Sequence, residues 1–214
     1  MMKSALLTVC APLMLGVPLA LTAIPPAHAQ SAAAASGPAA PIGDLYAALK
    51  TIQAPGGGSA ESRASALAPT IDKVFDLEAI LHKVVGLKYD GFTTEQKQAL
   101  LAAFRNYTIA AYVDSFKPGA NVQFAVDPAV RAAPGGTGQL VTTHIGGTDN
   151  PTGTEIDYPM EQASGGWRVT DVLLQGHISQ AAAQRAEFRS SLSAGGVEGL
   201  TAALQAKAKK FLGE

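Results

Sequence analysis

The histidine and aspartate side chains of this sequence are its best candidates for acid–base chemistry. His144 and His177 lie in or at the end of segments with strand-like sequence, and Asp157 and Asp171 lie in neighbouring segments of the same kind. An imidazole held beside a carboxylate can take up and release a proton near neutral pH. The same side chains could also provide half of a metal site. A histidine–aspartate site is therefore one hypothesis for function.

The spacing of these residues does not match a known catalytic or metal motif. The sequence has no His-Glu-x-x-His, no Gly-x-Ser-x-Gly and no Gly-x-x-x-x-Gly-Lys-Ser/Thr, and its glycine pairs are typical of turns. An aspartate in an apolar strand, such as Asp171, more often lies on the solvated face or bonds a backbone group or an arginine, for which Arg168 and Arg185 are candidates. The sequence therefore predicts no catalytic residue, no metal site and no cofactor.

The elements that would position these residues are helices first, then strands, then helices again. Apolar residues recur at helical spacing, and Thr93 with Gln96 forms a capping-box signature at the start of the longest such segment. The expected helices cover residues 44–52, 60–75 with a kink or break at Pro69, 76–86 and 93–116. The expected strands cover residues 121–126, 139–145, 154–160 and 167–174, and helices separated by Gly195 and Gly196 close the chain.

Short glycine-rich turns separate the expected strands, which favours an antiparallel meander. Helices before and after such a meander are typical of an α+β fold in which helices cover one face of a sheet. We therefore predict an α+β fold with a four-stranded antiparallel meander sheet covered by several helices.

The first residues have the features of a secretory signal peptide. Lys3 precedes an apolar stretch over residues 5–24, and Ala27-His28-Ala29 is a small-x-small cleavage site. We predict a signal peptide over residues 1–29 with cleavage after Ala29, a flexible segment over residues 30–41 and a single domain over residues 42–214. An uncleaved membrane anchor is the competing interpretation. Cleavage would place the product in the periplasm of a bacterium with two membranes.

Composition excludes several other classes of function. The only cysteine, Cys10, would leave with the signal peptide, so disulfides and thiol catalysis are not expected. The formal net charge is −1, and basic residues are neither clustered nor interleaved with aromatic residues. This pattern argues against a nucleic-acid partner. After the first residues, no stretch is long and apolar enough to span a bilayer.

An ordered series of motifs resembles a known family over about residues 67–212. Its most specific block is Trp167-x-Val169-x-Asp171-Val172, followed by Gly176-x-x-Ser179 and Arg185-x-x-Phe188. The other matching positions are Phe75-Asp76, Gly86, Thr94-x-Gln96, Phe104, Tyr112, Pro118-Gly119, Tyr158, Gly195-Gly196 and Leu200 to Lys207. This order resembles the MlaC family of periplasmic lipid-carrier proteins, which includes the toluene-tolerance proteins and the hopanoid-associated HpnM branch. The chain has Lys88-Tyr89 where the family often has tryptophan, and Gln175 to Ser179 where it usually has Glu-Gly-Val-Ser.

The resemblance implies a carrier without catalytic activity that binds a phospholipid or a hopanoid in an apolar cavity. Its partners would be an inner-membrane ABC transporter with an MCE-domain protein and an outer-membrane complex. The candidate lipid-binding residues are Leu77, Ile80, Leu81, Val84, Phe104, Tyr107, Ala111, Tyr112, Val122, Phe124, Tyr158 and Met160. From periodicity alone the same residues could form an ordinary filled core. The alternatives are a small exported α+β enzyme that uses the histidines and aspartates, and a non-catalytic adaptor without an internal cavity.

Overall fold

The computed structural model describes residues 37–133, 137–147 and 150–213. The predicted signal peptide and residues 30–36 of the predicted flexible segment lie outside the described residues. The first described helix, α2 (Ala39–Ile52), begins before the expected start at Asp44 and includes the last residues of that segment. Within the described ranges, no helix is long and apolar enough to cross a bilayer.

The other helices lie close to the expected ranges. They are α3 (Ala60–Val74), α4 (Leu77–Val85), the short 3-10 helix η1 (Gly86–Gly91), α5 (Thr94–Ser115) and α6 (Gln180–Leu212). The capping box is present at the start of α5, where the Thr93 and Gln96 side chains bond each other's backbone N–H groups. Helix α3 continues through Pro69, which is exposed. Helix α6 bends at Gly196, whose φ of 61° separates the helical stretches that the glycine pair predicts.

One antiparallel sheet contains all the strands. They are β1 (Gln123–Ala132), β2 (Gln139–Gly147), β3 (Asn150–Ala163), β4 (Gly166–Val169), β5 (Leu173–Leu174) and β6 (Ile178–Ser179). Their order is β1-β2-β3-β5-β6, with β4 also paired to β3. The α+β class and the antiparallel meander are confirmed, although the sheet has six strands rather than four.

The difference in strand number arises where the predicted strand over residues 167–174 divides into β4 and β5. The carboxylate of Asp171 accepts a hydrogen bond from the Val172 N–H at 2.7 Å, so this N–H does not join the ladder with β3. Local bonding of a short polar side chain to the backbone competes with strand pairing in this way. The short strand β6 then pairs with β5 and leads into α6.

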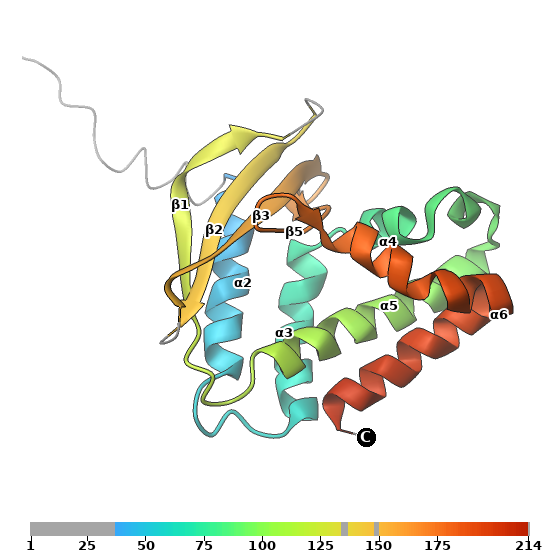
Figure 1. The fold of residues 1–214 in the computed structure, drawn as a ribbon, viewed down its shortest axis with the longest axis horizontal. Helices are drawn as coiled ribbons and strands as arrows, with labels where there is room; N and C mark the ends of the chain where they lie inside the picture. The colour runs from blue at the N-terminus through green and yellow to red at the C-terminus, as the bar shows by residue number, and fades with distance from the viewer. Residues whose placement is uncertain (1–36, 134–136, 148–149, 214) are drawn as a thin grey trace, which may run out of the picture.

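Helices cover one face of the curved sheet (Figure 1). Helices α2 and α3 lie side by side behind the sheet, and α5 extends away from it to pack against α6. The covered face carries alternate residues of the long strands, including Val141, Thr143, Ile156 and Tyr158, all of which are buried. The apolar core therefore lies between this face and the helices.

Candidate functional site

A cavity of about 330 Å³ lies where α4, α5 and the start of α6 meet the sheet. Its walls are mainly apolar and aromatic. The apolar and aromatic lining residues are Phe75, Leu77, Ile80, Phe104, Tyr107, Ala111, Tyr112, Phe116, Ile145, Ile156, Tyr158, Val172, Leu174 and Ala181. The polar lining residues are Thr108, Ser115, Asp171, Gln180 and Gln184.

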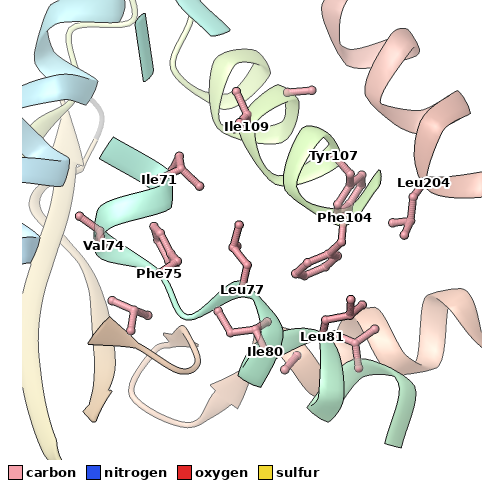
Figure 2. Close-up of a cluster of buried hydrophobic side chains, with 14 of the residues drawn as sticks. Ile71, Val74, Phe75, Leu77, Ile80, Leu81, Phe104, Tyr107, Ile109 and Leu204 are labelled. Atoms are coloured by element: carbon pink, nitrogen blue, oxygen red, sulfur yellow. The ribbon is translucent and has the colours of Figure 1, made fainter. Parts of the chain in front are cut away.

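The step between α3 and α4 positions one wall. Phe75 has an extended backbone, and the N–H of Asp76 donates a hydrogen bond to the Val169 carbonyl at 2.9 Å, which ties the step to β4. The Asp76 carboxylate then caps α4 by accepting from the Ala79 N–H at 2.9 Å. This arrangement directs Leu77 into the space facing α5, where Figure 2 shows it near Phe75 and Phe104.

Helix α5 provides the facing wall. Its cavity residues recur at spacings of three and four positions, with Tyr107–Thr108 and Ala111–Tyr112 as adjacent pairs, and so occupy one side of the helix. The Tyr112 ring lies 5.8 Å from the Phe75 ring between centroids, and 6.1 Å from that of Phe116. Burial, with Tyr46 as a second cause, raises the pKa of Tyr112 well above its ordinary value. The phenol therefore stays neutral, as an apolar ligand site requires.

The sheet wall is fixed by a chain of buried hydroxyl groups. The Tyr46 hydroxyl donates to Thr143 Oγ1 at 2.6 Å, and Thr143 Oγ1 donates to the Ile156 carbonyl at 2.9 Å. The hydroxyls of Tyr46 and Tyr158 are 3.2 Å apart. Because the single Tyr46 proton goes to Thr143, Tyr158 is left to donate to Tyr46. Burial is the main cause that raises the pKa of both tyrosines.

The polar groups of the cavity lie at the start of α6. Asp171 Oδ1 accepts from the N–H groups of Val172 and Ala181, and Oδ2 accepts from the Ser179 hydroxyl at 2.6 Å. Asp171 therefore caps α6 together with Ser179, which matches the expectation that it bonds backbone groups. Gln184 Oε1 is buried and has no hydrogen-bond partner among the described residues. No lysine or arginine is among the described lining residues.

The structure places most of the predicted lipid-binding residues in this lining, but not all. The residues found there are Leu77, Ile80, Phe104, Tyr107, Ala111, Tyr112 and Tyr158. Leu81 and Met160 are fully buried in the core outside the lining, and Val84 faces a separate groove beside α6. Phe124 stacks on Tyr46 at 4.5 Å between ring centroids, and Val122 bonds the Gln53 side chain through its backbone.

Several lining residues were missed by the sequence reasoning. Ile156 could have been found, since it alternates with Tyr158 along one strand and shares its sheet face. Phe75 belongs to the Phe75-Asp76 motif, and helical periodicity does not mark it as a cavity residue because its backbone is extended. Val172, Leu174 and Ala181 reach the cavity because the chain turns between β5 and α6, and local periodicity does not reveal that turn.

The histidines and aspartates of the alternative acid–base hypothesis do not form hydrogen bonds or ion pairs with each other in the described part of the chain. His144 Nε2 lies 3.6 Å from Asp127 Oδ1, and His177 Nδ1 lies 2.6 Å from the Gln175 carbonyl oxygen. The carboxylate of Asp157 is buried and accepts from Arg131 and Thr142. Among the residues described, no group of three or more His, Cys, Asp or Glu side chains could hold a metal ion.

Comparisons with known proteins agree with this architecture. A family model described as "MlaC protein" matches residues 41–206. A solved structure of a phospholipid-binding protein from Ralstonia solanacearum, in complex with a phospholipid, superposes with a TM-score of 0.66 and 23% sequence identity. The match covers 81% of this chain and 98% of that chain. At this identity the likeness establishes the fold. No curated protein matches the chain.

Proposed function

This chain belongs to the MlaC family, as the match over residues 41–206 establishes, and on that premise we propose that it binds a lipid in the cavity between α5 and the sheet. The observation that carries the proposal is the predominantly apolar wall of this cavity. Each methylene transferred from water to such a wall contributes roughly 0.8 kcal/mol. The transfer of an acyl chain or a polycyclic skeleton from water into this cavity is therefore favourable.

The cavity size bears on how the lipid enters. A volume of about 330 Å³ is at the small end of the range of roughly 300–1,000 Å³ that is usual for ligand pockets. A lipid with two acyl chains would need the walls to move apart. Phe116, directly after α5, contacts β1 through its ring, which lies 5.5 Å from that of Phe124 between centroids, and within the described chain no backbone hydrogen bond joins α5 to a strand. We therefore propose that α5 moves relative to the sheet when lipid enters or leaves.

The cargo is a phospholipid or a hopanoid. The phospholipid bound by the structurally similar Ralstonia protein supports the first. The absence of lysine and arginine from the described lining is compatible with the second, because a hopanoid has no phosphate to neutralise. Both lipids require an apolar cavity, and the experiment below distinguishes them by mass.

We further propose that the protein acts in the periplasm and shuttles its lipid without catalysis between an inner-membrane ABC transporter with an MCE-domain protein and an outer-membrane complex. Residues 1–29 would direct export and be removed after Ala29, a flexible segment would end before α2, and the chain from α2 onward would form the lipid-binding domain. Family membership and the signal-like sequence of the first residues support this assignment.

Lipid analysis of the exported protein tests the proposal. The full chain is expressed in a bacterium that makes both phospholipids and hopanoids, and the product is purified from the periplasm without detergent. Mass spectrometry of the intact protein reads its N-terminus, which we expect at Gln30. Solvent extraction should release about one lipid per protein, as a single cavity allows. A protein that carries no lipid and takes up none from vesicles would contradict the proposed function.

A further inference from the structure

The loop that follows α4 presents a leucine to the solvent. Leu87, in η1, is 87% exposed, the largest exposure among the exposed large hydrophobic side chains of the described residues. A single exposed leucine is unremarkable by itself. Its surroundings decide whether it has a role.

A groove of about 300 Å³ lies beside Leu87, between α4 and the first half of α6. Its buried floor consists of Val84, Val85, Phe188 and Leu200. The remaining lining residues are more exposed and include several cations. They are Leu87, Lys88, Arg185, Arg189, Leu192 and Ser193.

Arg185 lies at the edge of the groove, against the backbone of Gly86. Its guanidinium group lies against Gly86 so closely that a Cβ atom on Gly86 would overlap Nη2. Gly86 also has a φ of 74°, which side-chain-bearing residues rarely adopt. The positive φ favours glycine at this position, and without a Cβ atom there the exposed Arg185 side chain can lie against the backbone at the edge of the groove.

The cations of the groove are not neutralised by nearby acids. Within the described chain, no ion pair links Lys88, Arg185 or Arg189 to a carboxylate. Two acids on the same elements have other partners, since Asp90 lies 3.0 Å from His82 and Glu187 lies 2.6 Å from Lys207. The groove edge is therefore locally positive, although the whole chain has a net charge of −1.

We propose that Leu87, Lys88, Arg185 and Arg189, here called the Leu87 patch, dock the protein on an anionic lipid bilayer. An apolar side chain surrounded by cations matches the interface of such a membrane, where the leucine enters the boundary of the acyl chains and the cations bind lipid phosphates. Charge complementarity with an anionic surface is the observation that selects this partner.

The Leu87 patch is close to the cavity along two helices. Helix α4 has Leu77 and Ile80 in the cavity lining and Val84 and Val85 in the groove. On α6, Gln184 lines the cavity and the next residue lines the groove. In Figure 1, α4 and the loop after it lie beside the first half of α6, on the side of the molecule away from β1. Docking through the Leu87 patch would thus bring the cavity near the membrane surface.

Vesicle co-sedimentation of the exported protein tests the proposal. Wild type should bind vesicles of equal parts phosphatidylglycerol and phosphatidylcholine but not vesicles of phosphatidylcholine alone. Raising NaCl from about 0.05 to 0.5 M should weaken binding, because salt screens the attraction. Lys88→Glu with Arg189→Glu should weaken it roughly tenfold or more, since each basic residue near an anionic surface contributes to affinity. Leu87→Ser should also weaken it, by up to about tenfold.

The matched control is Lys209→Glu with Lys210→Glu. These exposed residues lie in the last turn of α6, so the pair makes the same change in net charge away from the Leu87 patch. It should retain wild-type binding.

Absence of wild-type binding to anionic vesicles, as expected if the patch binds an acidic protein instead, would overturn the proposal. Equal losses in the control and patch pairs would also overturn it. If the patch pair fails to fold, Leu87→Ser gives the same decision, because its side chain is exposed. Cavity-bound lipid, measured by extraction, should be unchanged in every variant, so this result is independent of the proposed carrier function.

Discussion

The hydroxyl of Tyr46 on α2 donates a hydrogen bond to Oγ1 of Thr143 on β2 across 2.6 Å. These residues are far apart in the sequence, and both are buried where the first helix meets the sheet. Thr143 passes a hydrogen bond on to the Ile156 carbonyl, and the hydroxyl of Tyr158, a cavity residue, lies beside that of Tyr46. The first helix is thereby connected to the sheet wall of the cavity.

Replacing Tyr46 by phenylalanine should destabilise the protein by about 1–2 kcal/mol. The change removes a buried donor and leaves Thr143 and Tyr158 with unpaired groups, which costs free energy in an apolar interior. Urea unfolding measures the difference. Thr51→Ala on the same helix is the control, because the Thr51 hydroxyl is exposed and bonds only within the helix. It should change stability by about 0.5 kcal/mol or less. Equal stability of wild type and Tyr46→Phe would show that the hydroxyl chain is not a stabilising contact.

Ala111→Phe should reduce the lipid content of the purified protein. Ala111 lines the cavity on α5, and a phenyl ring would occupy space that the lipid needs. The measurement is the ratio of extracted lipid to protein. Ala102→Phe is the matched control, because Ala102 is exposed on the same helix and does not line the cavity. Lipid content that is unchanged in Ala111→Phe, or equally reduced in both variants, would contradict the assignment of the cavity.

Much of the fold follows from local sequence. The capping box of Thr93 and Gln96 and the apolar spacing after it predict α5, and the glycine pair predicts the bend of α6 at Gly196. The number of strands does not follow in this way. The division of the last long predicted strand depends on Asp171, whose carboxylate bonds groups both next to it and at the start of α6. The contact with the Ala181 N–H exists only after the chain has turned between β5 and α6.

Stability should fall between about pH 10 and 12. Burial, with the charge of Glu187 as a second cause, raises the pKa of Tyr107 from 10.0 to about 12. Above pH 10 the unfolded state therefore releases the proton while the folded state keeps it, so rising pH favours unfolding. Between pH 9 and 11, Tyr107→Phe should lose about 1 kcal/mol less stability than wild type. Urea unfolding at both pH values measures this, and parallel losses in the two proteins would refute the environment assigned to Tyr107.

Asp171→Ala should destabilise the protein by about 2–3 kcal/mol, as measured by urea unfolding. The carboxylate accepts hydrogen bonds from Val172, Ser179 and Ala181, and hydrogen bonds to a charged group at a helix start are among the stronger ones. The control is Asp114→Ala, which removes a partly exposed ion pair with Lys117. That pair should contribute about 1 kcal/mol or less. A loss for Asp171→Ala no larger than for Asp114→Ala would show that Asp171 is not an essential cap of α6.

The site was less predictable than the fold, because periodicity identifies buried faces but does not separate a cavity wall from a filled core. Leu77 and Leu81 lie one turn apart on α4, yet Leu77 lines the cavity and Leu81 is fully buried outside its lining. The difference depends on what faces each side chain across the fold. The opposite wall comes from segments distant in sequence, such as Ile156 and Leu174, which no local pattern connects to α4.

Photocrosslinking of bound lipid tests the central claim most directly. The exported protein is loaded with a phospholipid whose acyl chain carries a diazirine, irradiated, digested and analysed by mass spectrometry. The lipid should attach to peptides that contain cavity residues, above all Leu77, Ala111, Tyr112 and Leu174. Attachment mainly to the groove beside Leu87, to the exposed strand β1, or to no site would contradict the claim that this cavity holds the lipid.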